Sequence, residues 1–253
     1  MTGEATLQSP RVRVLADRDE LGRVAAHDVA AEIRQRLAGQ EQVRMVLAAA
    51  PSQQETLLRL RDEPGIDWTR VTSFHMDEYL ELSPEAPERF GNWLRHTFFD
   101  HVPLRAAHLI EPGTDPDGCA RRYAELLAEA PIDVVCIGIG VNGHLAFNDP
   151  PVADLADPLD VKVVELDHEC RMQQVTDECF DTLDEVPHAA VTLTVPRLLA
   201  ADRLFCMVPG RGKRHAVRQA LTGPIGAQCP ATALRTHPDC MLYLDEEAAP
   251  DDV

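Results

Sequence analysis

The sequence has no long apolar run, little positive charge and almost no lysine. No stretch approaches the ~18 uninterrupted apolar residues of a transmembrane helix, so we expect no membrane span. The 24 Lys+Arg residues against 42 Asp+Glu give a formal net charge of −18, which would repel the phosphates of a nucleic acid. Apolar residues still make up 45% of the chain, enough for a sizeable core, which excludes a disordered acidic tail and a collagen-like chain.

The cysteines lack the spacing of a metal or redox motif. No C-x-x-C pair occurs among the seven, which stand at positions 119, 136, 170, 179, 206, 229 and 240. We therefore expect no zinc site built from cysteine pairs. The N-terminal segment MTGEATLQSPRVRV has no apolar core of an export signal, and scattered thiols without such a signal predict a protein of the reducing cytoplasm.

Short β-branched runs alternate with amphipathic stretches along the whole chain. The runs predict strands at residues 43–49, 71–75, 132–138, 161–166, 190–195, 204–208 and 241–244. The amphipathic stretches predict helices at residues 19–37, 53–61, 89–99, 117–130 and 212–221. This alternation indicates a single α/β domain over residues 1–253, with a mostly parallel sheet that is covered by helices on both faces.

Ligands of such a sheet bind beyond the carboxyl ends of the strands, so polar residues after each predicted strand are candidate site residues. Ser52 has the position of a helix N-cap, where backbone N–H groups attract an anion. Asp77 and Glu78 directly follow an apolar strand, and a carboxylate desolvated there would have a raised pKa and could act as a base on a substrate C–H group. A plain helix cap and solvated loop acids are the structural alternatives.

The segment after the strand at 132–138 contains the largest number of candidate site residues. Three glycines satisfy the dinucleotide fingerprint G-x-G-x-x-G, at positions 138, 140 and 143. That motif needs a helix after its third glycine, and the prolines at 150, 151 and 158 forbid a sustained one. We therefore expect a ligand other than a dinucleotide, and interpret His144, flanked by Asn142 and Asp149, as a proton shuttle held by a carboxylate.

Two cations follow later strands by a few residues. Arg171 comes after the strand at 161–166, and Lys213, one of only two lysines, lies in a glycine-rich turn that opens a helix. Such a turn is suited to gripping a phosphate. Two cations facing one cleft would recruit an anion to this acidic chain, whereas ordinary surface cations are the alternative for either one alone.

Two motifs occur together in this chain, Phe-His-Met-Asp-Glu-Tyr at residues 74–79 and Gly-His-Leu-Ala-Phe-Asn at residues 143–148. Together they resemble the glucosamine-6-phosphate deaminase (isomerase) family, and residues 91–102 are similar to the family's segment after the first motif. The resemblance runs from about residue 10 to residue 245. It implies a modified Rossmann-like fold without a nucleotide, and the conversion of glucosamine 6-phosphate and water into fructose 6-phosphate and ammonia.

The resemblance also implies roles for individual residues. Asp77 matches the base that moves a proton between C2 and C1, and His144 matches the group that opens the pyranose ring. Asn142 and Asp149 match the side chains that orient this histidine. The phosphate-binding positions correspond to Ser52, Gln53, Arg171 and Lys213. The implied partner is a small sugar phosphate, without metal or organic cofactor, and a homo-oligomer of unspecified size is expected.

This chain departs from the family's common pattern at three places. Gln53-Gln54 stand where two glycines are common, which indicates a different backbone conformation or the use of amide side chains at the phosphate. Asn142 replaces a frequent acidic residue and cannot stabilise an imidazolium by charge, so that task passes to Asp149. Asp149 is itself one methylene shorter than the glutamate often found there.

The same reaction on a galactosamine phosphate or a related amino-sugar phosphate stays open, and three other functions are weighed against it. A 6-phosphogluconolactonase would use His144 to activate water, but Asp77 and the segment Phe147-Asn148-Asp149 favour the isomerase. A sugar-phosphate sensor needs a DNA-binding domain, yet only about 40 residues precede the first predicted strand, and they are expected to form one helix. A dehydrogenase is the weakest alternative, because the fingerprint lacks its helix.

Overall fold

The structure is a computed structural model that describes residues 10–150 and 152–251. Expectations for Pro151 and for the absence of an export signal in residues 1–9 therefore lie outside the described residues. No helix in the described part of the chain is long and apolar enough to cross a bilayer. All seven cysteines are free thiols.

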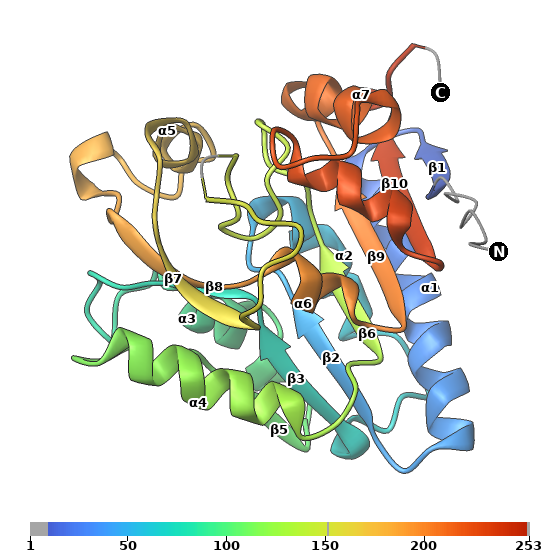
Figure 1. The fold of residues 1–253 in the computed structure, drawn as a ribbon. Coiled ribbons are helices and arrows are strands. Elements are labelled where there is room, and N and C mark those ends of the chain that lie inside the picture. Colours follow the sequence, from blue (N-terminus) through green and yellow to red (C-terminus); the bar gives the residue numbers. More distant parts are fainter. Residues whose placement is uncertain (1–9, 151, 252–253) are drawn as a thin grey trace, which may run out of the picture.

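A seven-stranded, fully parallel sheet forms the centre of the molecule (Figure 1). Its strands, in spatial order, are β1 (Arg11–Leu15), β10 (Cys240–Asp245), β9 (Arg203–Val208), β6 (Val134–Ile137), β2 (Val43–Leu47), β3 (Val71–His75) and β5 (Ala106–His108). From β2 the chain builds outward through β3 to β5, then returns to β6 and builds the other way. Strand order thus reverses between β2 and β6, which is where such sheets place a ligand crevice.

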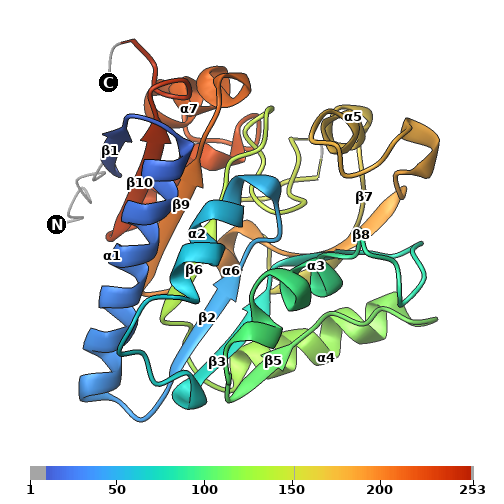
Figure 2. The ribbon, with the colours of Figure 1, turned by 180° about the vertical axis from the view of Figure 1, so that it is seen from behind.

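Helices cover both faces of this sheet, as the sequence predicts. Figure 2 shows α1 (Arg18–Gly39), α2 (Gln54–Leu60) and α3 (Phe90–Thr97) in front of one face, and their apolar side chains share a buried cluster with Met45, Leu47 and Phe205 of the strands. The opposite cluster joins alternate strand residues to helices α4 (Pro116–Ala128), α6 (Val195–Leu199) and α7 (Arg214–Thr222). Strand residues alternate between the two clusters because successive side chains of a strand point to opposite faces.

A second, three-stranded antiparallel sheet extends from the first at one end. It pairs β4 (Asp77–Tyr79) with β8 (Ala189–Leu193), and β8 with β7 (Val161–Glu165). Helix α5 (His168–Thr176) follows β7, and a small apolar cluster around Tyr79 and Phe147 lies beneath it. Two strands predicted from the sequence, at 161–166 and 190–195, belong to this sheet rather than to the parallel one. β-branched runs predict strands, but they do not specify the pairing partner.

Two further expectations about the fold are wrong. Strand β1 lies within the N-terminal stretch that we expected to be helical only, because its alternating arginine and valine residues give a half-exposed edge strand without an apolar run. Asp77 lies in strand β4 and not in a loop, because the single residue Met76 separates β4 from the end of β3.

Candidate active site

A pocket of about 140 Å³ opens at the carboxyl ends of the central strands. Its wall contains residues that directly follow β2, β3, β6 and β9, so it lies at the point where the strand order reverses. Four residues singled out from the sequence line it together: Ser52, Asp77, His144 and Lys213. The fold therefore brings one acid, one imidazole, one hydroxyl and one ammonium group to a single cavity.

Asp77 forms the acidic wall of the pocket. Its backbone pairs with Thr192 of β8, and only 6% of the residue is exposed. Burial raises the pKa of Asp77 well above its usual range, and the nearby carboxylates of Glu78 and Asp149 raise it further. A carboxyl group with a raised pKa is better suited than an ordinary one to accept and return a proton in general acid–base chemistry.

Glu78, the neighbour of Asp77, serves a different purpose. Adjacent residues of a strand point to opposite faces, so its fully buried carboxylate lies away from the pocket. It accepts hydrogen bonds from the backbone N–H groups of Tyr79 (3.0 Å), Phe90 (3.0 Å) and Gly91 (2.9 Å), and lies 3.5 Å from Arg89. Phe90 and Gly91 belong to the first turn of α3, so Glu78 holds the start of that helix in place. Of the two adjacent carboxylates, only that of Asp77 lines the pocket.

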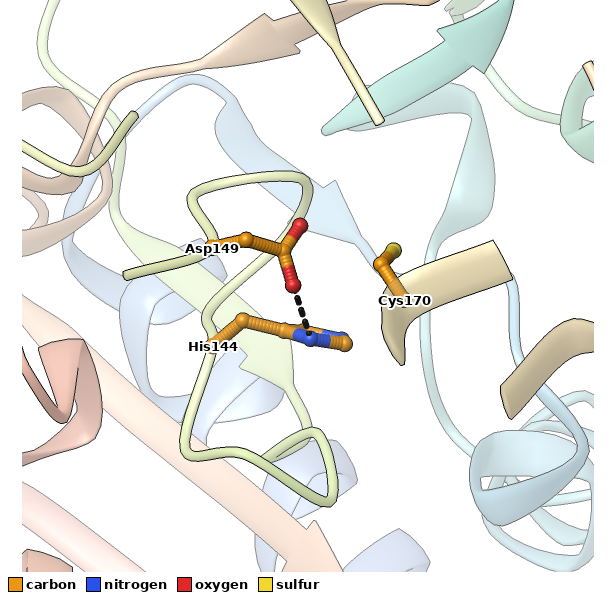
Figure 3. Close-up of side chains that lie close together, drawn as sticks. All are labelled: His144, Asp149 and Cys170. Carbon is orange, nitrogen blue, oxygen red and sulfur yellow. Dashed lines mark ion pairs between the residues drawn. The ribbon is translucent and has the colours of Figure 1, made fainter. Parts of the chain in front are cut away.

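The imidazole of His144 contacts the carboxylate of Asp149 through one ring nitrogen (Figure 3). Its Nδ1 lies 2.9 Å from Oδ1 of Asp149, and the same oxygen accepts a hydrogen bond of 2.9 Å from Nδ2 of Asn142. The Asn142 side chain also accepts from the backbone N–H of His144 at 3.0 Å. Burial alone would raise the pKa of Asp149, but its contacts with His144 and Asn142 outweigh this and lower it. Asp149 is thus the anionic partner that the sequence predicts for the imidazole.

The glycines of the fingerprint make room for this arrangement. A Cβ on Gly140 would come within 2.2 Å of the His144 ring, and one on Gly143, whose φ is +86°, would come within 2.4 Å of the Cys229 sulfur. Residues 141–150 form turns and an isolated bridge instead of a helix, which confirms that the segment lacks the helix of a dinucleotide site. Gly140 therefore accommodates an imidazole where a dinucleotide site would accommodate a pyrophosphate.

The cationic end of the pocket holds Lys213 and Ser52. Burial lowers the pKa of the Lys213 amine, and the nearby Asp177 opposes this shift. Ser52 is not a helix N-cap: it lies within the short 3₁₀ helix Pro51–Gln53, whose cap residue is Ala50. The Gln53 side chain is buried beneath the loop, where it donates to Oγ of Ser52 and to the carbonyl of Met207. Both glutamines have helical φ angles, so the loop needs no glycine here.

Arg171 lies apart from the residues that line the pocket. Its guanidinium donates to the carbonyls of Leu183 (2.7 Å) and Val186 (2.9 Å), in the turn between α5 and β8. Of the two cations that the sequence singled out, the structure therefore places only Lys213 in the pocket wall.

Arg18 is a second cation in the pocket wall that the sequence analysis missed. It is the first residue of α1, shortly after the end of β1, and its Nε lies 2.7 Å from Oε1 of Glu55. The signal for Arg18 was its place after a parallel strand, which went unused because β1 was not predicted. Helix α5 and the turn after it contribute further polar lining residues, namely Gln173, Gln174 and Asp177.

Among the described residues, one group of potential metal ligands gathers in this region: His144, Asp149 and Cys170. Cys170 lies on α5, and the other two belong to the glycine-rich segment (Figure 3).

The fold and the site define an α/β protein with a doubly wound sheet, whose pocket at the switch point holds an acid and an imidazole. The chain belongs to the family of glucosamine-6-phosphate isomerases and 6-phosphogluconolactonases, whose family model matches residues 16–242. The resemblance seen in the two sequence motifs is therefore confirmed.

Two proteins with similar sequences are glucosamine-6-phosphate deaminases. The one from Exiguobacterium sibiricum is 35% identical over 73% of this chain and 71% of its own length, and the one from Bacillus velezensis is 35% identical over 76% and 80%. A monomeric glucosamine-6-phosphate deaminase of known structure superimposes with a TM-score of 0.85 at 27% identity, covering 94% of this chain and 98% of the other. The 6-phosphogluconolactonase from Trypanosoma brucei shares the fold, with a TM-score of 0.79 at 18% identity over 95% of this chain and 98% of its own.

Proposed function

We propose that this chain is a glucosamine-6-phosphate deaminase, which converts glucosamine 6-phosphate and water into fructose 6-phosphate and ammonia. The observation that carries the proposal is the presence of Asp77 and His144 in one pocket with a cationic end. The names of the similar proteins support the same substrate and reaction. The residues that we assign to the reaction all belong to one chain and line one pocket or contact its lining.

Ring opening is the first step, and we assign it to His144. With Nδ1 directed at Asp149, the other ring nitrogen, Nε2, is left to exchange a proton with the ring oxygen and the anomeric hydroxyl of the sugar. Asp149 stabilises the imidazolium that forms when Nε2 takes the proton. Asn142 can orient this pair but adds no charge, so the electrostatic support comes from Asp149 alone.

Isomerisation and deamination follow, and we assign the proton transfer to Asp77. Its carboxylate removes the proton from C2 of the open-chain aldehyde while O1 takes up a proton, which gives an enolamine with a C1=C2 double bond. Asp77 then returns the proton to C1 and the 2-amino group gives up a proton, so that C1 becomes a CH2OH group and C2 an imine. Water adds to the imine, ammonia departs, and the ketone of fructose 6-phosphate remains. One carboxylate can serve both carbons because they are adjacent.

The phosphate group would lie at the end of the pocket where Arg18, Ser52 and Lys213 meet. Arg18 could exchange its contact with Glu55 for a bidentate contact with phosphate. Replacing Arg18 with Ala is expected to raise KM for glucosamine 6-phosphate about tenfold while changing kcat little, because the contact lies far from the reacting carbons. Steady-state kinetics test this, with Arg23→Ala on the exposed side of the same helix as the control. An unchanged KM in the Arg18 variant would remove Arg18 from the phosphate site.

The function itself is tested by incubating the purified protein with a panel of hexosamine 6-phosphates and the corresponding free sugars. We expect ammonia and fructose 6-phosphate in equal amounts from glucosamine 6-phosphate, and far less from the free sugars. A parallel assay with 6-phosphogluconolactone tests the hydrolase alternative, which the shared fold alone supports. Lactone hydrolysis without ammonia release would overturn the proposal. We place the reaction in the cytoplasm, because seven free thiols suit a reducing compartment.

A further inference from the structure

The three side chains His144, Asp149 and Cys170 form a cluster that the proposed reaction does not fully use. Their ligand atoms all lie within 4.8 Å of one another, and exposure is 9% for His144, 1% for Asp149 and 0% for Cys170 (Figure 3). We propose that this cluster binds a divalent ion of the zinc class, and that the bound ion inhibits the enzyme.

A weakly satisfied carboxylate points to such a ligand. Oδ1 of Asp149 is in contact with both His144 and Asn142, whereas the buried Oδ2 has no strong donor, and the remaining side-chain partner of this carboxylate is the Cys170 thiol. A thiol is a weak hydrogen-bond donor, and a cation bound between the carboxylate and the sulfur would satisfy the buried charge better. The backbone N–H of Cys170 is already bound to Asp167, so this part of α5 is fixed with the sulfur near the carboxylate.

The donor set selects the class of ion. One imidazole nitrogen, one carboxylate oxygen and one sulfur form a mixed set that suits Zn²⁺, with Co²⁺ as a spectroscopic substitute, and does not suit Mg²⁺ or Ca²⁺, which prefer oxygen ligands. Zinc bonds of roughly 2.0–2.3 Å to these donors fit ligand atoms that lie this close together. The fourth position of a tetrahedral ion would be left to water or to a hydroxyl of the sugar.

The consequence for catalysis rests on the proposed function. An ion at Nδ1 of His144 and at the Asp149 carboxylate replaces the contact between them, so Asp149 can no longer stabilise a protonated His144. The ion is therefore an inhibitor and takes no part in the proposed reaction.

Inhibition by zinc gives the first test. Activity is measured against Zn²⁺ concentration for the unmodified protein, for Cys170→Ser and for Cys179→Ser, a matched control at a cysteine that lines the pocket. We expect Zn²⁺ but not Mg²⁺ to inhibit, with the inhibition constant raised at least about tenfold in Cys170→Ser and unchanged in Cys179→Ser. Equal zinc sensitivity of the unmodified protein and Cys170→Ser would overturn the proposal.

Binding of Co²⁺ gives a second readout that does not depend on activity. Co²⁺ bound to a thiolate has a charge-transfer band in the near ultraviolet, and we expect this band in the unmodified protein and in Cys179→Ser but not in Cys170→Ser. Its absence from the unmodified protein would overturn the metal site even if the deaminase assay succeeds. Its presence in a protein that releases no ammonia would support the site and count against the proposed function instead.

Discussion

Replacing Asp77 with Asn is expected to abolish ammonia release from glucosamine 6-phosphate and the exchange of the C2 hydrogen with solvent. An amide cannot accept the proton from C2, and loss of a general base typically costs about 10²–10⁴-fold in rate. Binding of the sugar should change little, because Asn keeps the size of the side chain. Deuterium exchange followed by NMR measures the effect, with Asp100→Asn at an exposed position as the control. Exchange at the normal rate in Asp77→Asn would exclude Asp77 as the base.

The raised pKa of Asp77 gives the same substitution a second, opposite effect on stability. A carboxyl group whose pKa is raised in the folded state contributes stability below its unfolded pKa, and this contribution is lost as pH rises through the folded pKa. Because Asn cannot ionise, the stability of the Asp77→Asn variant does not fall in this way as the pH rises. The melting temperature of Asp77→Asn should therefore exceed that of the unmodified protein near neutral pH, with a difference that shrinks in acid. A lower melting temperature at neutral pH would contradict the buried, destabilised carboxyl group.

Replacing His144 with Gln is expected to lower kcat/KM for the cyclic substrate by about 10²–10⁴-fold, because Gln cannot exchange the proton of the ring oxygen. A reduced, acyclic amino-hexitol 6-phosphate needs no ring opening, so its affinity should fall less than about threefold. Isothermal titration measures this affinity, and His215→Gln at an exposed position serves as the control. An equally large loss of affinity for the acyclic compound would assign His144 to binding and not to ring opening.

The fold was largely predictable because its signals are local. Buried parallel strands such as β2 and β9 are continuous apolar runs, and α1 has a long apolar stripe. The small antiparallel sheet was not predicted, because the pairing of β4 with β8 joins residues more than a hundred positions apart. Edge strand β1, with its alternating arginines, carries too weak a signal to be recognised.

The candidate site was predictable to the extent that it depends on strand ends. Asp77, His144 and Lys213 each follow a strand, and the carboxyl ends of parallel strands meet at one edge of the sheet. The direction of a long side chain depends instead on its tertiary neighbours. Arg171 follows β7 of the antiparallel sheet, and nearby carbonyls hold its guanidinium away from the pocket, whereas Arg18 enters the pocket from α1.

The acid limb of the pH profile reports on Asp77, the proposed base. Since Asp77 must be ionised to accept a proton, kcat/KM of the unmodified protein should rise as pH passes upward through its raised pKa. The pH dependence of kcat/KM measured by steady-state kinetics checks this, and a profile that is flat on the acid side would contradict it.

A crystal structure with the acyclic amino-hexitol 6-phosphate bound tests the placement of the substrate most directly. We predict that the Asp77 carboxylate will lie against C1 and C2, that His144 will lie against the oxygen on C5, and that the phosphate will contact Lys213 and Arg18. A ligand bound in the reverse direction, or one that reaches only one of Asp77 and His144, would contradict the assignment of both groups to a single sugar.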